Sequence, residues 1–168
     1  MEEILIRPAE RGDLERMTEI YNYYVINTPI TFDLTPVSVA SRVPWFDAHS
    51  DGARYRLFVA QQAGSVLGFA GTGRFRDRAA YDTTVEATIY CAHEATGRGL
   101  GSQLYCALFE AIQNEDIHRI MAGITMPNDA SIALHERFGF KEVAMFSENG
   151  RKFDRYWDVC WMERPLRI

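Results

Sequence analysis

The residues with the clearest chemical potential lie between Thr84 and Gly101. A glycine-rich segment, with Gly97 and Gly99 at its centre, follows an apolar stretch there. Glycine permits positive φ and lets a ligand approach the backbone closely. The start of a helix adds unpaired N–H groups and the positive end of a dipole. With a helix after it, this segment can hold a phosphate or pyrophosphate; the alternative is a plain glycine-rich turn.

Two nucleotide-binding motifs do not fit this segment. The dinucleotide fingerprint G-x-G-x-x-G fails because Ser102 replaces its last glycine, and Arg119 and Ile120 stand where an acidic residue is expected. A P-loop fails because Gly-Lys-Ser/Thr is absent. The segment therefore predicts anion binding outside these two families of site.

Charged residues lie on the N-terminal side of the glycines. Glu86 is the one acidic residue within the stretch from Thr84 to Cys91. Before it, residues 72–81 form a polar loop with three arginines and two aromatic residues: Arg74, Arg76, Arg78, Phe75 and Tyr81. Arginine binds carboxylate or phosphinate-like groups through two parallel hydrogen bonds. The loop is thus either a substrate contact or a solvated surface loop.

Periodicity and breaker residues predict the elements that must position these groups. The predicted strands cover residues 4–8, 56–60, 66–71, 84–91, 118–125, 141–146 and 156–162. The predicted helices cover residues 14–25, 35–46, 102–116 and 129–138. Asp13 is expected to cap the first helix, and Thr35-Pro36 to begin the second, which Pro44 should kink or end early. Asn128 should cap the fourth helix and Gly139 should end it. Turns are expected at residues 61–65 and at Glu148-Asn149-Gly150.

Composition sets the broad class of the protein. The 168 residues fit a single domain, 1–168, and an apolar fraction of 47% is ordinary for a globular chain. No run approaches the roughly 18 apolar residues of a membrane helix. The acidic start without a long apolar region lacks a signal peptide, so a cytoplasmic location is expected.

Charge and cysteine content exclude further classes. A net charge of −5 argues against a general nucleic-acid binder. The three cysteines lack C-x-x-C spacing and are expected to be reduced and mostly structural. Because His49, His93 and His118 share no ligand spacing with carboxylates, no metal site is predicted.

Three separated signals resemble the GCN5-related N-acetyltransferases (GNAT). They are the strand, glycine loop and helix start at residues 86–102, the pattern Asn128-x-x-Ser131-x-x-x-His135 ending in Gly139-Phe140, and a closing pair of strands. The resemblance covers nearly the whole chain. It implies an α/β (α+β) fold, with a mixed, mostly antiparallel sheet of about seven strands, a central splay and about four flanking helices.

Further short motifs are similar to the phosphinothricin and methionine sulfone/sulfoximine N-acetyltransferase branch. They are Ile20-Tyr21-Asn22, Thr31-Phe32, Phe75-Arg76-x-Arg78-x-Ala80-Tyr81-x-x-Thr84-Val85-Glu86, and Lys152-Phe153 ahead of Trp157-Asp158-Val159. The resemblance implies acetyl-CoA in the splay and direct transfer of acetyl to the α-amino group of a small amino acid analogue. It also implies a homodimer.

The resemblance assigns roles to individual residues. Acetyl-CoA is expected to contact Ile89, Tyr90, Cys91, Thr96, Gly97, Arg98, Gly99, Leu100, Gly101, Ser102, Asn128 and Ser131. The amino acid is expected to contact Phe32, Arg74, Phe75, Arg76, Arg78, Tyr81, Val85, Glu86 and Ala87, with Arg76 ranked first among the arginines.

The chemistry is expected at two residues. Glu86 is the candidate base for the amine, directly or through water, or else the anion that fixes the ammonium group; it could also be a strand residue without a catalytic role. His135 could protonate the leaving thiolate, or it could serve only packing and hydrogen bonding.

Two rival functions stay open at this level. One is acetylation of another amine, such as a protein N-terminus or a polyamine. The other is a non-catalytic module that binds CoA. The physiological amine, a role in herbicide resistance, and the oligomeric state are likewise open.

Overall fold

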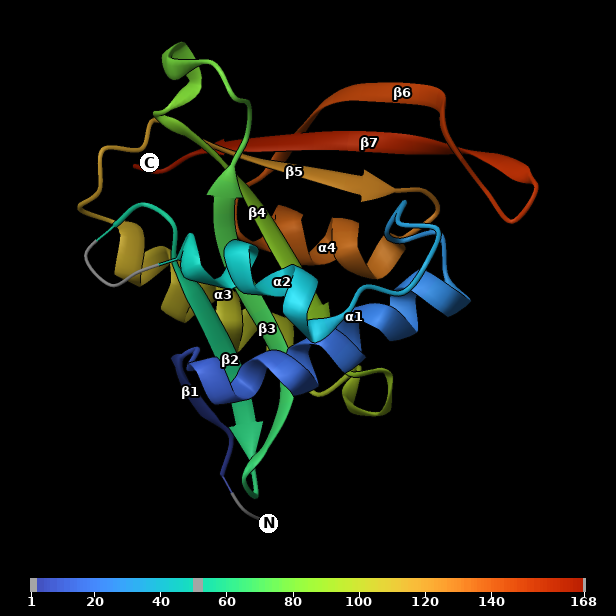
Figure 1. Ribbon diagram of the computed structural model, residues 1–168. Coiled ribbons are helices and arrows are strands. Elements are labelled where there is room, and N and C mark those ends of the chain that lie inside the picture. Colours follow the sequence, from blue (N-terminus) through green and yellow to red (C-terminus); the bar gives the residue numbers. More distant parts are fainter. Residues whose placement is uncertain (1–2, 50–52, 168) are drawn as a thin grey trace.

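A computed structural model describes residues 3–49 and 53–167 of the chain. Seven strands form one sheet in the order β1-β2-β3-β4-β5-β7-β6 (Figure 1). The strands are β1 (Leu5–Pro8), β2 (Leu57–Gln62), β3 (Ser65–Arg74), β4 (Thr84–Cys91), β5 (Arg119–Thr125), β6 (Lys141–Lys152) and β7 (Arg155–Pro165). The helices are α1 (Leu14–Asn27), α2 (Val39–Asp47), α3 (Leu100–Ile112) and α4 (Asp129–Arg137). This confirms the predicted fold class.

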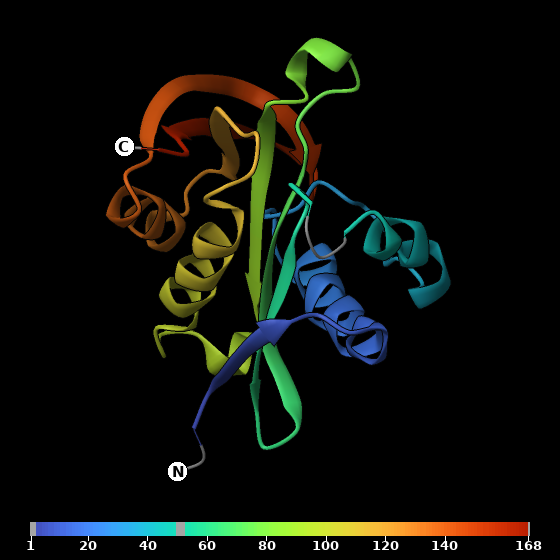
Figure 2. The ribbon, with the colours of Figure 1, turned by 90° about the vertical axis from the view of Figure 1, so that its left-hand side faces the viewer.

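The helices cover both faces of the sheet. Figure 2 shows α1 and α2 on one side and α3 and α4 on the other. The apolar face of α3 places Leu104, Leu108 and Ile112 in the core, each with 0% of its surface exposed. Each such side chain contributes about 1.5–3 kcal/mol by leaving water, so α3 is firmly fixed against the sheet. The loop that precedes α3 is therefore held at a defined place.

One strand pair differs from all the others. β4 and β5 run parallel, whereas the other neighbouring strands are antiparallel. Their pairing joins Thr84–Glu86 of β4 to residues 119–121 of β5 and stops there. β4 nevertheless continues to Cys91 and β5 to Thr125. The two strands therefore separate, and this is the splay that the resemblance implied.

The predicted start of the second helix is wrong. α2 begins after Ser38, whose hydroxyl accepts a hydrogen bond from Ser41 N at 3.1 Å, instead of at Thr35-Pro36. The preceding segment is tied to α1, because Asn22 exchanges two hydrogen bonds of 2.9 Å with the backbone of Val37. Pro44 neither ends nor interrupts α2, which continues to Asp47.

The predicted turn at Glu148-Asn149-Gly150 is also wrong. β6 continues through these residues to Lys152, with an irregular register between Phe146 and Gly150. The chain reverses at Phe153 and Asp154, whose φ angles of 52° and 57° match the primed turns that favour tight hairpins. The resulting β6–β7 hairpin is long and projects from the body of the molecule (Figure 1).

The expected Asp13 cap is replaced by an ion pair. Asp13 lies in a short 3₁₀ turn and makes no capping hydrogen bond to α1. Its carboxylate instead accepts hydrogen bonds from Arg7 at 2.7 and 2.8 Å and from Glu10 N at 2.8 Å. These contacts tie β1 to the start of α1. Among the residues described, no helix has both the length and the apolar character needed to cross a membrane.

Candidate active site

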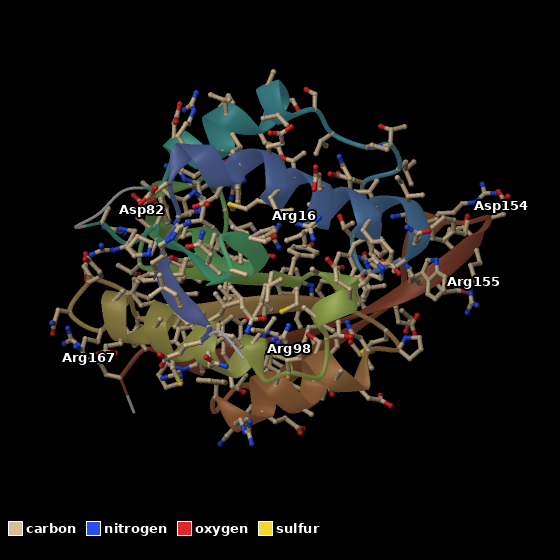
Figure 3. The ribbon with its side chains drawn as sticks, turned by 90° about the horizontal axis from the view of Figure 1, so that it is seen from below. Arg16, Asp82, Arg98, Asp154, Arg155 and Arg167 are labelled. Carbon is tan, nitrogen blue, oxygen red and sulfur yellow. The ribbon has the colours of Figure 1, made fainter. Side chains whose placement is uncertain are left out.

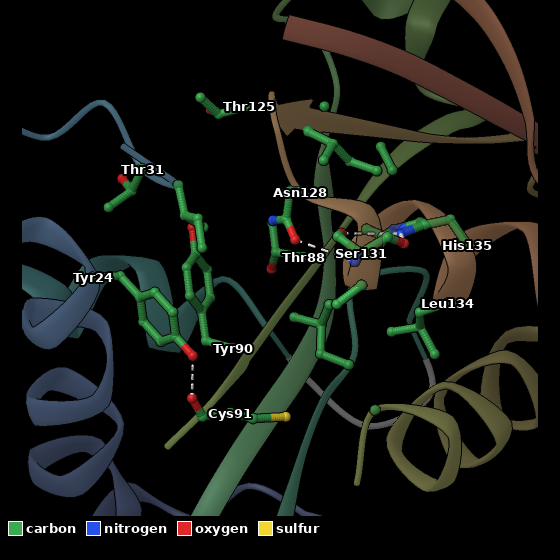
Figure 4. A pocket seen from close by; sticks show the side chains of 18 of the residues that line it. Tyr24, Thr31, Thr88, Tyr90, Cys91, Thr125, Asn128, Ser131, Leu134 and His135 are labelled. Atoms are coloured by element: carbon green, nitrogen blue, oxygen red, sulfur yellow. Dashed lines mark hydrogen bonds between the residues drawn. The ribbon is translucent and has the colours of Figure 1, made fainter. Parts of the chain in front are cut away.

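A cavity of about 700 Å³ opens where β4 and β5 separate. Its walls come from β4, the glycine loop, the start of α3, α4, β5, β7 and residues 30–32. In Figure 4, Tyr24, Thr31 and Tyr90 lie on one side of the pocket, and Asn128, Ser131 and His135 on the other. The edges of β4 and β5 beyond Glu86 and Met121 are unpaired with each other, so their backbone groups can bind a ligand.

The glycine loop forms one end of this cavity. Gly97 and Gly99 have φ angles of 75° and 74°, which L side chains adopt at a cost. Gly99 is the cap residue from which α3 begins. A Cβ at Gly101 would lie 2.9 Å from Cδ2 of Leu134, so glycine there lets α3 approach α4. The loop thus presents backbone N–H groups at a helix start, as anion binding requires.

The structure brings nearly all the residues expected to bind acetyl-CoA to this cavity. The residues that line it are Ile89, Tyr90, Cys91, Thr96, Gly97, Gly99, Leu100, Gly101, Ser102, Asn128 and Ser131. Arg98 does not line it, because its guanidinium donates a hydrogen bond to Gln62 Oε1 at 2.7 Å. Figure 3 shows Arg98 on the underside of the molecule.

Asn128, Ser131 and His135 are ordered by α4. Asn128 Oδ1 accepts the Ser131 N–H at 3.2 Å and so caps the helix, as the sequence predicted. His135 Nδ1 lies 2.7 Å from the Ser131 carbonyl oxygen, one turn earlier (Figure 4). A carbonyl only accepts, so Nδ1 carries a hydrogen.

The other imidazole nitrogen is engaged as well. His135 Nε2 lies 2.9 Å from the hydroxyl of Tyr105, which is 0% exposed. Burial lowers the pKa of His135, which favours the neutral ring, and its Nε2 then accepts a hydrogen bond from the Tyr105 hydroxyl. Tyr105 also lines the cavity. The structure adds Tyr105 as a direct partner of His135, whose role as a proton donor stays a prediction.

Glu86 lies in the wall of the same cavity. It is half-buried on β4, opposite Gly73 of β3 and Met121 of β5. Burial raises the pKa of Glu86, and the positive charge of Arg76 partly opposes this. Within the described chain, no hydrogen bond or ion pair occupies its carboxylate. Glu86 is therefore free to accept a proton or to bind a cation.

The predicted loop 72–81 begins later than expected, because β3 continues to Arg74. The arginine loop, which we define as Arg74 and residues 75–81, lies beside the cavity and does not line it. Arg74, Arg76 and Arg78 are exposed, and Tyr81 is 41% exposed. The Arg76 guanidinium lies 4.9 Å from the centre of the Phe75 ring. The substrate contacts predicted for this loop therefore stay predictions.

Val85 of β4 does not line the cavity, and its predicted contact with the amino acid stays a prediction. It is 0% exposed and belongs to the core, on the face of β4 opposite to the Glu86 side chain. Ala87 and Phe32 line the cavity as expected.

Trp161 is a lining residue that the sequence did not reveal. It pairs with Gly123 of β5, and a Cβ at Gly123 would lie 3.2 Å from the indole ring. The ring also packs edge-on against Phe75, with centroids 5.8 Å apart, which links the arginine loop to the cavity. Its Nε1–H is buried without a hydrogen-bond partner among the described residues. The register places Trp161 and Glu86 on the same face of the sheet.

Comparison with known proteins adds relatives of this architecture. The sequence matches the family described as "Acetyltransferase (GNAT) domain" over residues 6–161. It is 51% identical over 166 residues to phosphinothricin N-acetyltransferase of Streptomyces coelicolor, covering 98% of this chain and 97% of that one. It is 38% identical over 161 residues to the L-methionine sulfoximine/L-methionine sulfone acetyltransferase of Pseudomonas paraeruginosa, covering 96% and 94%.

A solved structure shows the same fold. The crystal structure of phosphinothricin acetyltransferase from Sinorhizobium meliloti in complex with AcCoA has a TM-score of 0.90 and 34% identity to this chain. The match covers 96% of this chain and 88% of that one. Within residues 3–49 and 53–167, no group of three or more histidine, cysteine, aspartate or glutamate side chains is placed to hold a metal ion.

Proposed function

Because the chain belongs to the GNAT acetyltransferase family, we propose that it acetylates the α-amino group of a small amino acid analogue such as phosphinothricin, methionine sulfone or methionine sulfoximine. The protein is an N-acetyltransferase that uses acetyl-CoA. The observation that carries the proposal is the unpaired, half-buried Glu86 carboxylate in the wall of a cavity that ends in a glycine-rich helix start.

The residues present fit acetyl-CoA. The N–H groups at the start of α3 suit its pyrophosphate, and the open edge of β4 at residues 89–91 suits the amides of its pantetheine arm. Asn128 and Ser131 add side-chain contacts on the opposite wall. When bound, acetyl-CoA supplies the acetyl group as a reactive thioester.

Glu86 is the proposed base. An alkyl ammonium is largely protonated near neutral pH and must lose a proton before its nitrogen can form an amide bond. A raised pKa makes the ionised Glu86 carboxylate a better proton acceptor. The thiolate that leaves needs a proton. The proposed source is the Tyr105 hydroxyl, which His135 Nε2 orients in the cavity wall and which regains its proton from solvent.

Two observations support the proposed class of acceptor: the positive charge near Glu86 and the names of the relatives. Positive charge beside Glu86 favours an acceptor that carries an anionic group together with its amine, and Arg76 is the nearest candidate. Relatives named for phosphinothricin and for methionine sulfoximine and sulfone support the same class. Herbicide resistance would follow where phosphinothricin is the acceptor.

The proposal extends to the whole chain. We propose a single-domain enzyme that works as a homodimer. Support for the dimer comes from apolar side chains on the β6–β7 hairpin that are between 42% and 56% exposed: Val143, Met145, Phe146, Phe153 and Tyr156. A cytoplasmic location is proposed because acetyl-CoA is available there.

The test is release of CoA thiol by the purified protein with acetyl-CoA and a panel of amines. The panel contains phosphinothricin, methionine sulfone, methionine sulfoximine, polyamines and peptides with free N-termini. Turnover confined to the first three supports the proposal, and Glu86→Gln should then lose turnover while retaining CoA affinity. Turnover only with polyamines or peptides would overturn the acceptor class. Binding of acetyl-CoA without any turnover would indicate a non-catalytic module.

A further inference from the structure

The last residues of β6, just before the hairpin turn, meet the loop between α1 and α2. Gly150 of β6 lies directly against the ring of Phe32, which lines the cavity. A Cβ at position 150 would lie 2.1 Å from Phe32 Cε2, 2.4 Å from Cζ and 2.6 Å from Cδ2. No side chain fits there unless the ring moves. The φ angle of Gly150 lies outside the left-handed region, so the backbone itself would accept alanine.

A buried lysine holds the same loop two residues further along β6. Lys152 is 4% exposed, and its Nζ donates a hydrogen bond of 2.8 Å to the carbonyl oxygen of Thr31. The hairpin backbone at this point is itself fixed, because Trp157 Nε1 donates to the Lys152 carbonyl at 2.9 Å. On the other side, the Thr31 hydroxyl lies 2.7 Å from the Tyr21 hydroxyl of α1. The loop is thus clamped between α1 and the hairpin.

Lys152 occupies this buried position although burial disfavours its charge. Burial lowers the pKa of Lys152, since removing an ammonium group from water disfavours its charged form. An apolar side chain would fill the space without that desolvation cost, but it could not bind the Thr31 carbonyl. The neighbouring Asp154 and Arg155 project at the far end of the hairpin (Figure 3) and take no part in the contact.

We propose that Gly150 and Lys152 are positioning residues that hold Phe32 in the wall of the acceptor pocket and thereby help to select the amino acid. The inference rests on the proposed function, since it assumes that the acceptor reaches Glu86 past this wall. Phe32, Thr31 and Asn149 line the same cavity as Glu86, and none of them belongs to the glycine loop or to the start of α3. A shift of Phe32 should therefore affect the acceptor and spare acetyl-CoA.

The first test is Gly150→Ala, with Gly12→Ala as the matched control. A Cβ at Gly12 meets nothing within 4 Å, and its φ is unstrained. Displacing a positioning contact by about 1 Å costs up to roughly a hundredfold in rate, so we expect Gly150→Ala to raise the acceptor KM by about tenfold or more. The KM for acetyl-CoA should stay within about twofold for both variants. Equal effects on both substrates, or none, would overturn the proposal.

A double variant separates the ring contact from a general loss of structure. Phe32→Leu removes the outer ring atoms, including those closest to position 150. In the Phe32→Leu background, Gly150→Ala should therefore raise the acceptor KM little further, because the effects of substitutions at two contacting residues do not add. Full additivity of the two changes would contradict direct contact between them.

Lys152→Met provides a second route, with Lys141→Met as its control on the exposed start of β6. Methionine keeps a long unbranched stem and removes the bond to Thr31. We expect a higher acceptor KM and faster amide hydrogen exchange in residues 28–38, with no such change in Lys141→Met. Hydrogen exchange is informative even if no amine on the panel is acetylated. Failure to acetylate any amine on the panel would defeat the proposed function. Unchanged hydrogen exchange in both Gly150→Ala and Lys152→Met would instead defeat this inference.

Discussion

The acid–base behaviour of Glu86 depends on two opposing influences. Burial in the cavity wall favours the protonated form and raises its pKa, while Arg76 favours the ionised form. Arg76 lies in a loop outside the cavity, so it acts on Glu86 through its charge and not through a direct ion pair. A base catalyst must be ionised to work, and the low-pH side of the activity profile should therefore report this balance.

Removing the charge of Arg76 should move that side of the profile. In Arg76→Ala the pKa of Glu86 rises further, so the fall of kcat/KM on acidification begins at a higher pH than in wild type. Arg74→Ala is the control, because Arg74 is also exposed but is not among the charges that act on Glu86. The measurement is kcat/KM for the acceptor between pH 5 and 9. If the pH profile of kcat/KM shifts equally in both variants, the shift reflects a general loss of positive charge and not a specific effect of Arg76 on Glu86.

Glu86→Gln should remove the carboxylate that this profile reports. We expect kcat to fall by roughly 10²–10⁴-fold, the usual contribution of a positioned base. CoA affinity, measured by calorimetry, should be retained because Glu86 lies apart from the glycine loop. A variant with near-normal kcat but a raised acceptor KM would instead make Glu86 the ligand of the ammonium group.

At the scale of elements, the start of α3 allows the donor site to be tested alone. Gly99 has a φ of 74° and open space around its Cα, so alanine there meets a backbone cost and no clash. We expect Gly99→Ala to lose about 1–2 kcal/mol of stability and to raise the KM for acetyl-CoA. The acceptor KM should not change. This is the reverse of the pattern expected for Gly150→Ala, and steady-state kinetics with each substrate varied in turn distinguishes the two.

His135, which links α4 to Tyr105 of α3, should make the free energy of unfolding depend on pH. Burial lowers its pKa in the folded state, so the folded chain binds fewer protons than the unfolded chain below the usual value near 6.5. The free energy of unfolding should therefore decrease as pH falls through that value, by at most about 1.4 kcal/mol per pH unit. Urea unfolding at pH 7.5, 6.5 and 5.5 measures this. His135→Gln should be less stable at pH 7.5 but less sensitive to acid; an identical slope in both proteins would contradict the assignment.

Local sequence signals predicted several elements well. Thr84–Cys91 was predicted with its observed bounds, because a run of β-branched and aromatic residues ends at a polar turn. The Asn128 cap was also predicted correctly. The start of α2 was not, because the hydrogen bonds between Asn22 and Val37 override the Thr35-Pro36 signal. The hairpin turn was missed because Phe153 is an unusual residue at positive φ.

Some residues of the cavity wall could be predicted from local sequence patterns, and others could not. The glycine loop and the α4 motif are contiguous in sequence, so their spacing alone could reveal them. Trp161, Gly123 and Tyr105 enter the cavity wall through strand register and helix packing, which join distant segments. The contact between Gly150 and Phe32 is of the same kind. No local pattern could have indicated them.

At the scale of the whole molecule, β6 is one of the two edge strands of the sheet and carries exposed apolar side chains. Such an edge is a common site of self-association. If the proposed dimer forms there, Val143→Lys with Met145→Lys should convert a dimer into a monomer. Val39→Lys on α2 is the control, since Val39 is also exposed, at 40%. Sedimentation velocity at several concentrations measures the change; a wild-type monomer at every concentration would rule out the dimer.

The separation of β4 and β5 has a consequence for the lifetime of the protein. The two halves of the sheet are joined through the first three residues of β4, so several backbone hydrogen bonds between β4 and β5 are missing at the centre of the sheet. A ligand seated there binds the folded chain and not the unfolded one, which adds about 2.7 kcal/mol of stability at a hundred times its Kd. Acetyl-CoA is then a thermodynamic ligand as well as a reactant. In cells depleted of acetyl-CoA the enzyme would therefore have a smaller free energy of unfolding. The amount of folded enzyme would then follow the supply of acetyl-CoA.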